Sequence, residues 1–258
     1  MSTEKESAIL TREDNGVFII TMNRPEVSNA VNGAIAEGMD AALTELDNNP
    51  NLYVGVITGA GKGFCSGMDL KAFLTNIKPF TDSRGFAGIV RKPAEKPLIA
   101  AVEGFAVAGG MEIALSCDLI VAAKNAKFGV PEVKRALVAA AGGLMRLPKR
   151  IPYHVAMHMA ITGEYIDAQR AYDVGLVAEV CEPGEALEKA VSLARLITKN
   201  GPYAVKCSKA IIRDTQDLTE AEGWEMQDRV GLPALDTEDA KEGAAAFAER
   251  REPVWKGK

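Results

Sequence analysis

The longest apolar stretch of the chain, residues 97–123, constrains the fold most. It reads PLIAAVEGFAVAGGMEIALSCDLIVAA and contains three carboxylates, Glu103, Glu112 and Asp118, together with three glycines. A membrane-spanning helix needs about 20 largely uncharged residues, so this stretch predicts buried strands joined by a helix in a water-soluble core. Because an unpaired buried charge is costly, its carboxylates need either partners or a function.

Strand and helix patterns alternate through the first two-thirds of the chain. The Asn15-Gly16 pair between two β-rich runs predicts a hairpin. Apolar residues at helical spacing predict a helix over 31–46. Further strands are expected at 53–58, 98–102 and 119–123, with a helix over 111–116, and 71–96 are expected as a loop or short helices. This alternation indicates an α/β fold.

From about residue 184 the pattern becomes helical. Four segments with helical spacing, separated by Gly and Pro, cover 185–198, 203–213, 219–230 and 237–250. We therefore predict two regions, a core domain of residues 1–183 and a helical region of residues 184–258.

Composition excludes several classes of protein. The 258 residues include 30 Lys and Arg against 35 Asp and Glu, a net charge of -5, so the whole chain has no general attraction for nucleic acid or anionic membranes. The first ten residues lack an apolar signal core and no cysteine pair forms CxxC, which predicts a cytoplasmic protein with free thiols. His154 and His158 are four residues apart but lack an HExxH pattern, so we predict packing or a subunit contact and no metal.

Two glycine-containing segments predict main-chain N–H groups that face a cavity. Residues 59–70 match neither a Walker A loop nor a dinucleotide fingerprint, but Gly67 could aim the N–H of Met68 into a cavity. Gly109-Gly110 opens a helix, where the first N–H groups are unpaired. Two such groups converging on one oxygen would form an oxyanion hole, although a Gly-Gly pair is also common in ordinary turns.

Glu112 and Glu132 both lie in apolar surroundings. Glu112 could simply stabilise the dipole of its helix, and Glu132 could pair with Lys134 or Arg135. Alternatively, two carboxylates whose environment keeps one protonated and one ionised would suit acid–base catalysis. A covalent triad is disfavoured, because the chain has two histidines and Ser66 lies outside a GxSxG motif.

Four blocks of the chain resemble the crotonase, or enoyl-CoA hydratase/isomerase, superfamily. They are TMNRPEVSNAVN, VITGAGKGFCSGMDL, IAAVEGFAVAGGMEIALSCDLIVAAKNAKFGVPE and AITGEYIDAQRAYDVGLVAEV. They occur in the family's order, and the resemblance covers nearly the whole chain. It implies a spiral of β-β-α repeats with a C-terminal helical region for trimerisation, as a homotrimer or a dimer of trimers. It also implies a coenzyme A thioester as the substrate, bound by the core domain.

The resemblance further implies roles for particular residues. The oxyanion hole falls on the N–H groups of Met68 and Gly109, and the two catalytic glutamates fall on Glu112 and Glu132. Glu112 would activate water, because its helix N-terminus should keep it ionised, and Glu132 would be the protonated acid. The residues implied for binding coenzyme A are Lys62, Ser66, Met68, Asp69, Leu70 and Lys71.

The implied reaction is the reversible syn addition of water to a 2-enoyl-CoA, with no metal or separate cofactor. Segment 136–141, which helps to shape the acyl pocket in the family, lacks the Gly and Pro of many hydratases. Residues 144–164 also resemble the branch acting on crotonobetainyl-CoA. The alternatives are therefore a crotonobetainyl-CoA hydratase or carnitinyl-CoA dehydratase, a Δ3-Δ2 enoyl-CoA isomerase, and a non-catalytic protein that binds acyl-CoA.

Overall fold

The computed structural model describes residues 7–74 and 78–258. Within them the largest sheet has six strands in the order β1-β2-β3-β6-β8-β11, and each neighbouring pair except β1 and β2 is parallel. The strands are β1 (Ile9–Asp14), β2 (Val17–Met22), β3 (Val54–Gly59), β6 (Leu98–Val102), β8 (Leu119–Ala123) and β11 (Glu179–Cys181). The predicted strands at 98–102 and 119–123 are confirmed.

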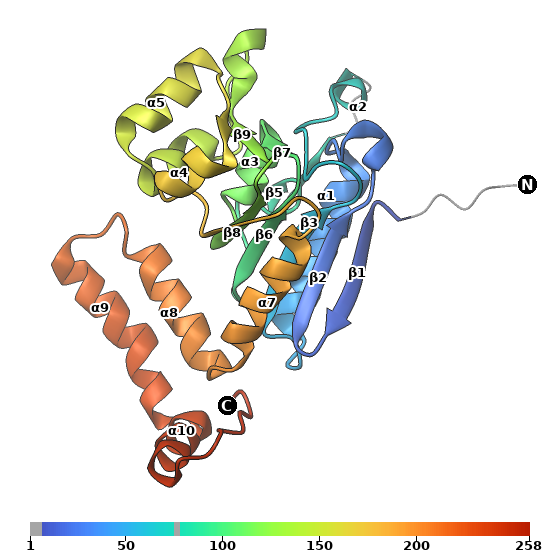
Figure 1. Cartoon of the computed structure of the whole chain (residues 1–258). Coiled ribbons are helices and arrows are strands. Elements are labelled where there is room, and N and C mark those ends of the chain that lie inside the picture. Colours follow the sequence, from blue (N-terminus) through green and yellow to red (C-terminus); the bar gives the residue numbers. More distant parts are fainter. Residues whose placement is uncertain (1–6, 75–77) are drawn as a thin grey trace, which may run out of the picture.

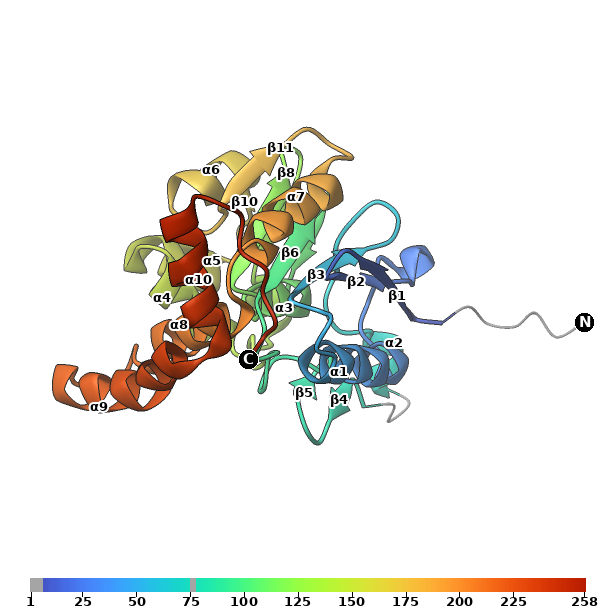
Figure 2. The same cartoon turned by 90° about the horizontal axis from the view of Figure 1, so that it is seen from below.

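Both faces of this sheet are covered. Alternate residues of a strand point into two separate cores, so that Phe18 of β2 packs in the core beneath helix α1 (Gly33–Asn48), whereas Val17 packs in the core beneath α7 (Ala186–Thr198). Figure 2 shows α1 and α7 on opposite sides of the sheet. Burial on two faces explains why the strands are apolar at nearly every position.

The predicted hairpin is confirmed, with Asn15 and Gly16 both at positive φ in the turn between β1 and β2. The predicted helix over 31–46 is confirmed as α1, which begins after Asn32, whose side chain accepts the N–H of Ile35. The described part of 71–96 differs from the prediction, because it forms a small hairpin of β4 (Phe80–Thr81) and β5 (Gly85–Phe86) after the short helix α2 (Leu70–Leu74).

The central elements repeat a β-β-α unit. Strand β6 is followed by β7 (Phe105–Val107) and α3 (Gly109–Ala114), and strand β8 is followed by β9 (Lys127–Gly129) and the 3-10 helix η2 (Pro131–Arg135). The second strands of the two units, β7 and β9, pair in parallel in a separate sheet that β10 (Ile166–Asp167) completes. Successive units therefore stack as turns of a spiral, the α/β crotonase fold expected from the sequence.

The remaining helices lie beside and below the core (Figure 1). They are α4 (Gly143–Arg150), α5 (Tyr153–Thr162), α6 (Ala168–Asp173), α8 (Pro202–Asp214), α9 (Glu220–Gly231) and α10 (Glu238–Glu249), with the 3-10 helices η1 (Pro25–Val27) and η3 (Leu232–Asp236). The four predicted C-terminal helices are confirmed. Helix α7 packs on the sheet, while α8, α9 and α10 extend away from it (Figure 1), and a boundary at residue 184 remains a proposal. None of the helices in the described ranges has both the length and the hydropathy needed to span a bilayer.

Two of the three carboxylates in the long apolar stretch have structural partners. Glu103 accepts the main-chain N–H groups of Gly184 and Ala186 at the start of α7, and Asp118 forms a 2.7 Å ion pair with Lys209. The third, Glu112, points into a cavity.

Candidate active site

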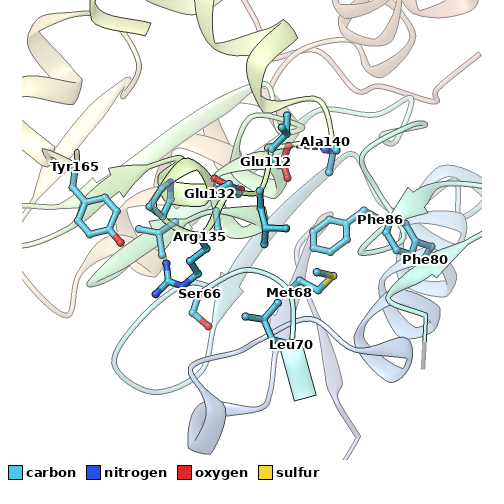
Figure 3. A pocket seen from close by; sticks show the side chains of 17 residues that line it. Ser66, Met68, Leu70, Phe80, Phe86, Glu112, Glu132, Arg135, Ala140 and Tyr165 are labelled. Atoms are coloured by element: carbon cyan, nitrogen blue, oxygen red, sulfur yellow. Dashed lines mark hydrogen bonds between the residues drawn. The ribbon is translucent and has the colours of Figure 1, made fainter. Parts of the chain in front are cut away.

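A cavity of about 460 Å³ opens between β7, α3, the β4–β5 hairpin and the segment after η2 (Figure 3). Six residues predicted for the site line it: Ser66, Met68, Leu70, Gly109, Glu112 and Glu132. The other lining residues are Phe80, Phe86, Val107, Ala108, Pro131, Arg135, Leu137, Val138, Ala140, Ala141 and Tyr165. The cavity therefore has a mostly apolar wall around two carboxyl groups.

Met68 and Gly109 occupy equivalent positions in two adjacent turns of the spiral. Cys65 pairs with Ala106 in a parallel β-bridge, and Met68 and Gly109 each lie three positions further along their segments. Neither main-chain N–H donates a hydrogen bond within residues 7–74 and 78–258. Stacking of the spiral thus brings two free N–H groups to the same wall of the cavity.

Glycines make this close approach possible. A Cβ on Gly67, whose φ is +101°, would lie 2.8 Å from the Cβ of Ala108 and 3.0 Å from the nitrogen of Gly109. A Cβ on Gly110 would lie 2.1 Å from the carbonyl oxygen of Cys65. The Gly109-Gly110 pair is therefore more than a turn, because it lets α3 pack directly against the 65–68 segment.

The carboxyl group of Glu112 is held by main-chain N–H groups that lie outside its own helix. Its Oε1 accepts the N–H of Ala141 at 2.7 Å and that of Gly143 at 2.9 Å, and the residue is 3% exposed. Burial raises the pKa of Glu112 to about 7, assisted by the charge of Glu132, although the two N–H groups oppose the shift. This direction corrects the expectation that the N-terminus of a short helix keeps Glu112 fully ionised, because desolvation is the larger effect.

Glu132 has fewer partners. Its Oε2 is buried and has no hydrogen-bond partner in the described part of the chain, and burial raises the pKa of the carboxyl group. Lys134 cannot be its partner, because the Lys134 ammonium bonds to Glu164 at 2.7 Å. Arg135 makes no ion pair within the described ranges. The alternative prediction, that Glu132 pairs with Lys134 or Arg135, is therefore wrong.

Only some of the residues expected to bind coenzyme A line the cavity. Ser66, Met68 and Leu70 line the cavity, whereas Lys62 and Lys71 are exposed outside its wall. Asp69 also lies outside the wall. Its carboxylate forms a 3.1 Å ion pair with Arg24 and accepts the N–H groups of Lys71 and Ala72 at the start of α2, and hydrogen bonds and the Arg24 charge lower its pKa. That side chain already has structural partners.

Sequence reasoning missed several features of the cavity. Phe80 and Phe86, in edge contact with ring centres 5.6 Å apart, come from strands too short to leave a periodic pattern. Tyr165 and Arg135 line the opposite part of the cavity (Figure 3). The N–H donors to Glu112 are main-chain groups, which leave no side-chain pattern in the sequence. The Gly142-Gly143 pair after the 136–141 segment was the one sequence feature that could have pointed to them.

The arrangement can support acid–base chemistry on a substrate with a carbonyl group. Two free N–H groups can bind a developing oxyanion. Two carboxyl groups with pKa values raised by burial can share one proton, so that one acts as a base and the other as an acid.

Comparison with known proteins identifies the family. A family model described as enoyl-CoA hydratase/isomerase matches residues 12–258. The chain is 41% identical to the enoyl-CoA hydratase EchA19 of Mycobacterium tuberculosis over 93% of both chains. It is also 41% identical to a carnitinyl-CoA dehydratase of Salmonella arizonae, over 98% of this chain and 99% of the relative.

Solved structures agree with this relationship. The fold matches a crystal structure of an enoyl-CoA hydratase from Mycobacterium tuberculosis with a TM-score of 0.96 and 48% identity, over 98% of this chain and all of the other. A carnitinyl-CoA hydratase from Mycobacterium avium matches with a TM-score of 0.80 and 41% identity, over the same shares. The chain therefore belongs to the enoyl-CoA hydratase/isomerase family, as a hydro-lyase of the enoyl-CoA hydratase type.

Proposed function

We propose that the protein adds water reversibly and in syn geometry to a 2-enoyl-CoA thioester, giving a 3-hydroxyacyl-CoA. The observation that supports this most directly is the presence of both Glu112 and Glu132 in one cavity with the free N–H groups of Met68 and Gly109. An isomerase that moves a double bond needs one acid–base group, whereas hydration needs a base for water and an acid for carbon.

In the proposed mechanism the thioester oxygen accepts hydrogen bonds from Met68 and Gly109. Glu112, as the carboxylate, takes a proton from water while the oxygen of water bonds to C3, and the electron pair of the double bond moves onto the thioester as an enolate. Glu132 then gives its proton to C2, so that the net change is the addition of one water. Loss of one oxyanion donor would cost on the order of 3 kcal/mol of barrier.

The two glutamates are assigned by their contacts. Glu112 receives two N–H groups on one oxygen, which favours the ionised form and leaves the other oxygen for water. Glu132 has a buried oxygen without a hydrogen-bond partner in the described residues, which disfavours the ionised form and fits a protonated acid.

We propose an uncharged acyl group as the preferred substrate, because the wall formed by Phe80, Phe86, Leu137 and Val138 is apolar. Turnover of carnitinyl-CoA is the second candidate, and two observations favour it. They are the similarity to a carnitinyl-CoA dehydratase and the Phe80–Phe86 pair, whose ring faces could bind a trimethylammonium group.

The experiment is a turnover panel with purified protein. It compares straight-chain 2-enoyl-CoA thioesters of several lengths, crotonobetainyl-CoA and 3-enoyl-CoA, and follows the absorbance of the conjugated thioester. Hydration of 2-enoyl-CoA supports the proposal, preference for crotonobetainyl-CoA supports the second candidate, and action on 3-enoyl-CoA alone would indicate an isomerase. Binding of acyl-CoA without any turnover would indicate a non-catalytic protein.

For the quaternary state we propose a homotrimer or a dimer of trimers. Trp224 of α9 and Phe247 of α10 are 57% and 87% exposed, so neither packs in the core of its own chain, whereas Met226 is buried. Large exposed apolar side chains on a helical extension are typical of subunit contacts. Light scattering of the purified protein tests this, and a monomer would contradict it.

A further inference from the structure

Arg146, on helix α4, is a partly buried cation that has no carboxylate in ion-pair contact among the residues that the structure describes. Its guanidinium donates to the carbonyl oxygen of Val90 at 2.5 Å and to the hydroxyl of Ser116 at 3.2 Å, and no ion pair joins it to another described residue. Burial and the neighbouring charge of Arg150 lower its pKa, whereas the charge of Glu112 raises it. A cation taken out of water without a direct partner is costly, so its presence beside Glu112 calls for an explanation.

Two connections join Arg146 to Glu112. The Ser116 hydroxyl that accepts from Arg146 donates to the main-chain oxygen of Glu112 at 2.8 Å. The guanidinium also lies against the turn that holds the carboxyl group, because a Cβ on Gly142 would be 2.7 Å from Nη1 of Arg146. Gly143, the next residue, donates its N–H to Oε1 of Glu112. Arg146 therefore contacts both Ser116, just after the helix that carries Glu112, and the turn that fixes the Glu112 side chain.

We propose that Arg146 is the positioning residue for Glu112, bracing the Ser116 hydroxyl and the 142–143 turn around it and supplying the positive charge that favours its carboxylate. The hydrogen bond to Val90 ties the same guanidinium to the segment that follows β5. This inference rests on the proposed function, in which Glu112 must be ionised to activate water.

The charges that act on Glu112 come from two elements. Glu132, from η2, raises its pKa, and Arg146, from α4, lowers it, together with the N–H groups of Ala141 and Gly143. Removal of the Arg146 charge leaves only the two N–H groups to oppose the effect of burial on the Glu112 carboxylate. The pKa of Glu112 should then rise further.

Arg150 provides a matched control. It lies one turn further along α4, and its Nη2 donates to the carbonyl oxygens of Leu115 and Cys117 at 3.2 and 2.6 Å, so it also ties α4 to the end of α3. It is not among the largest influences on the pKa of Glu112, which include Arg146. Replacement of Arg150 should cost similar structural contacts without changing the ionisation of Glu112.

The test compares the pH dependence of kcat/KM for 2-enoyl-CoA hydration in wild type, Arg146→Gln, Arg146→Lys and Arg150→Gln. We expect the acidic limb of the profile to move to higher pH in Arg146→Gln, to stay in place with a lower kcat in Arg146→Lys, and to stay in place in Arg150→Gln. An unmoved limb in Arg146→Gln, or an equal shift in Arg150→Gln, would overturn the inference.

Two further measurements keep the inference testable. If Arg146→Gln does not fold, Arg146→Lys should still lower kcat at least about tenfold and Arg150→Lys less than about twofold, and equal losses would contradict the positioning role. A 13C NMR titration of Glu112 in the unliganded protein needs no turnover. It should report a higher pKa for Glu112 in Arg146→Gln than in wild type, whether or not the wild type hydrates an enoyl-CoA. Failure of the wild type to hydrate any enoyl-CoA would contradict the proposed function but not this inference.

Discussion

Gly143 donates its main-chain N–H to Oε1 of Glu112 over 2.9 Å, joining positions 31 residues apart in the sequence. The contact is tight, since a Cβ at position 143 would lie 3.0 Å from Cγ and 3.1 Å from Oε1 of Glu112. Glycine at this position therefore sets the place of the proposed base, and the second glycine of the Gly142-Gly143 pair has a role that side-chain chemistry alone would not indicate.

Gly143→Ala should lower kcat for hydration by about one to two orders of magnitude and leave KM nearly unchanged. The added methyl group must displace Glu112 and weaken a charge-assisted hydrogen bond worth about 1.5–3 kcal/mol. Steady-state kinetics with a 2-enoyl-CoA measure this effect. A variant with wild-type kcat would show that the 143 N–H does not matter for the chemistry.

Gly110→Ala should both destabilise the protein and impair turnover. The new Cβ would meet the Cys65 carbonyl at 2.1 Å, and a main-chain atom cannot move aside without shifting the segment that presents the Met68 N–H. We expect a loss of about 2–3 kcal/mol in the free energy of unfolding, measured by chemical denaturation.

Gly223→Ala, in helix α9, is the control for that substitution. A Cβ there would meet no atom of the described chain within 4 Å, so this variant should be as stable as wild type or more stable by up to about 1 kcal/mol, because alanine favours helix. Equal destabilisation of the two variants would contradict the proposed packing role of Gly110.

The pH profile of hydration should be bell-shaped. The active form holds one proton on the pair, with Glu112 ionised and Glu132 protonated, so kcat/KM should rise with pH as Glu112, whose pKa burial raises, loses its proton. It should fall again when Glu132 also loses its proton, because the acid for C2 is then absent. A rate that is highest near pH 4 and falls steadily above it would contradict the assignment of Glu112 as base.

Glu112→Gln should make the protein more stable at pH 8. Because the pKa of Glu112 is raised in the folded state to about 7 from 4.5, unfolding releases a proton between these values, and stability falls as pH rises through this window. Glutamine removes that penalty, on the order of 3 kcal/mol, and can still accept from Ala141 and Gly143. Thermal unfolding should show a gap in Tm at pH 8 that shrinks at pH 5.

Glu242→Gln is the control, because the pKa of Glu242 is shifted in the opposite direction to that of Glu112. The Arg251 guanidinium and the N–H of Val254 lower the pKa of Glu242 to about 2, so its replacement should not raise Tm at pH 8. A Tm gain in both variants would mean that removal of any carboxylate stabilises the protein, and the argument from burial of Glu112 would fail.

The sequence predicted the longer elements well, because their signals are local. Asn15-Gly16 requires positive φ at two positions, and α1 repeats apolar residues at helical spacing. Strands of two or three residues, such as β5 and β10, carry no periodicity and were missed. Both glutamates of the cavity were predicted, but the ionisation of Glu112 was not, because it depends on burial and on main-chain donors from a distant segment.

The most direct measurement is the rate of hydration of a 2-enoyl-CoA by wild type, Glu112→Gln and Glu132→Gln, followed by loss of absorbance of the conjugated thioester, with acyl-CoA affinity measured in parallel. Our account predicts measurable turnover by wild type, a loss of several orders of magnitude in each variant, and nearly unchanged affinity. Near-wild-type hydration by either variant would contradict a mechanism in which one glutamate activates water and the other protonates carbon.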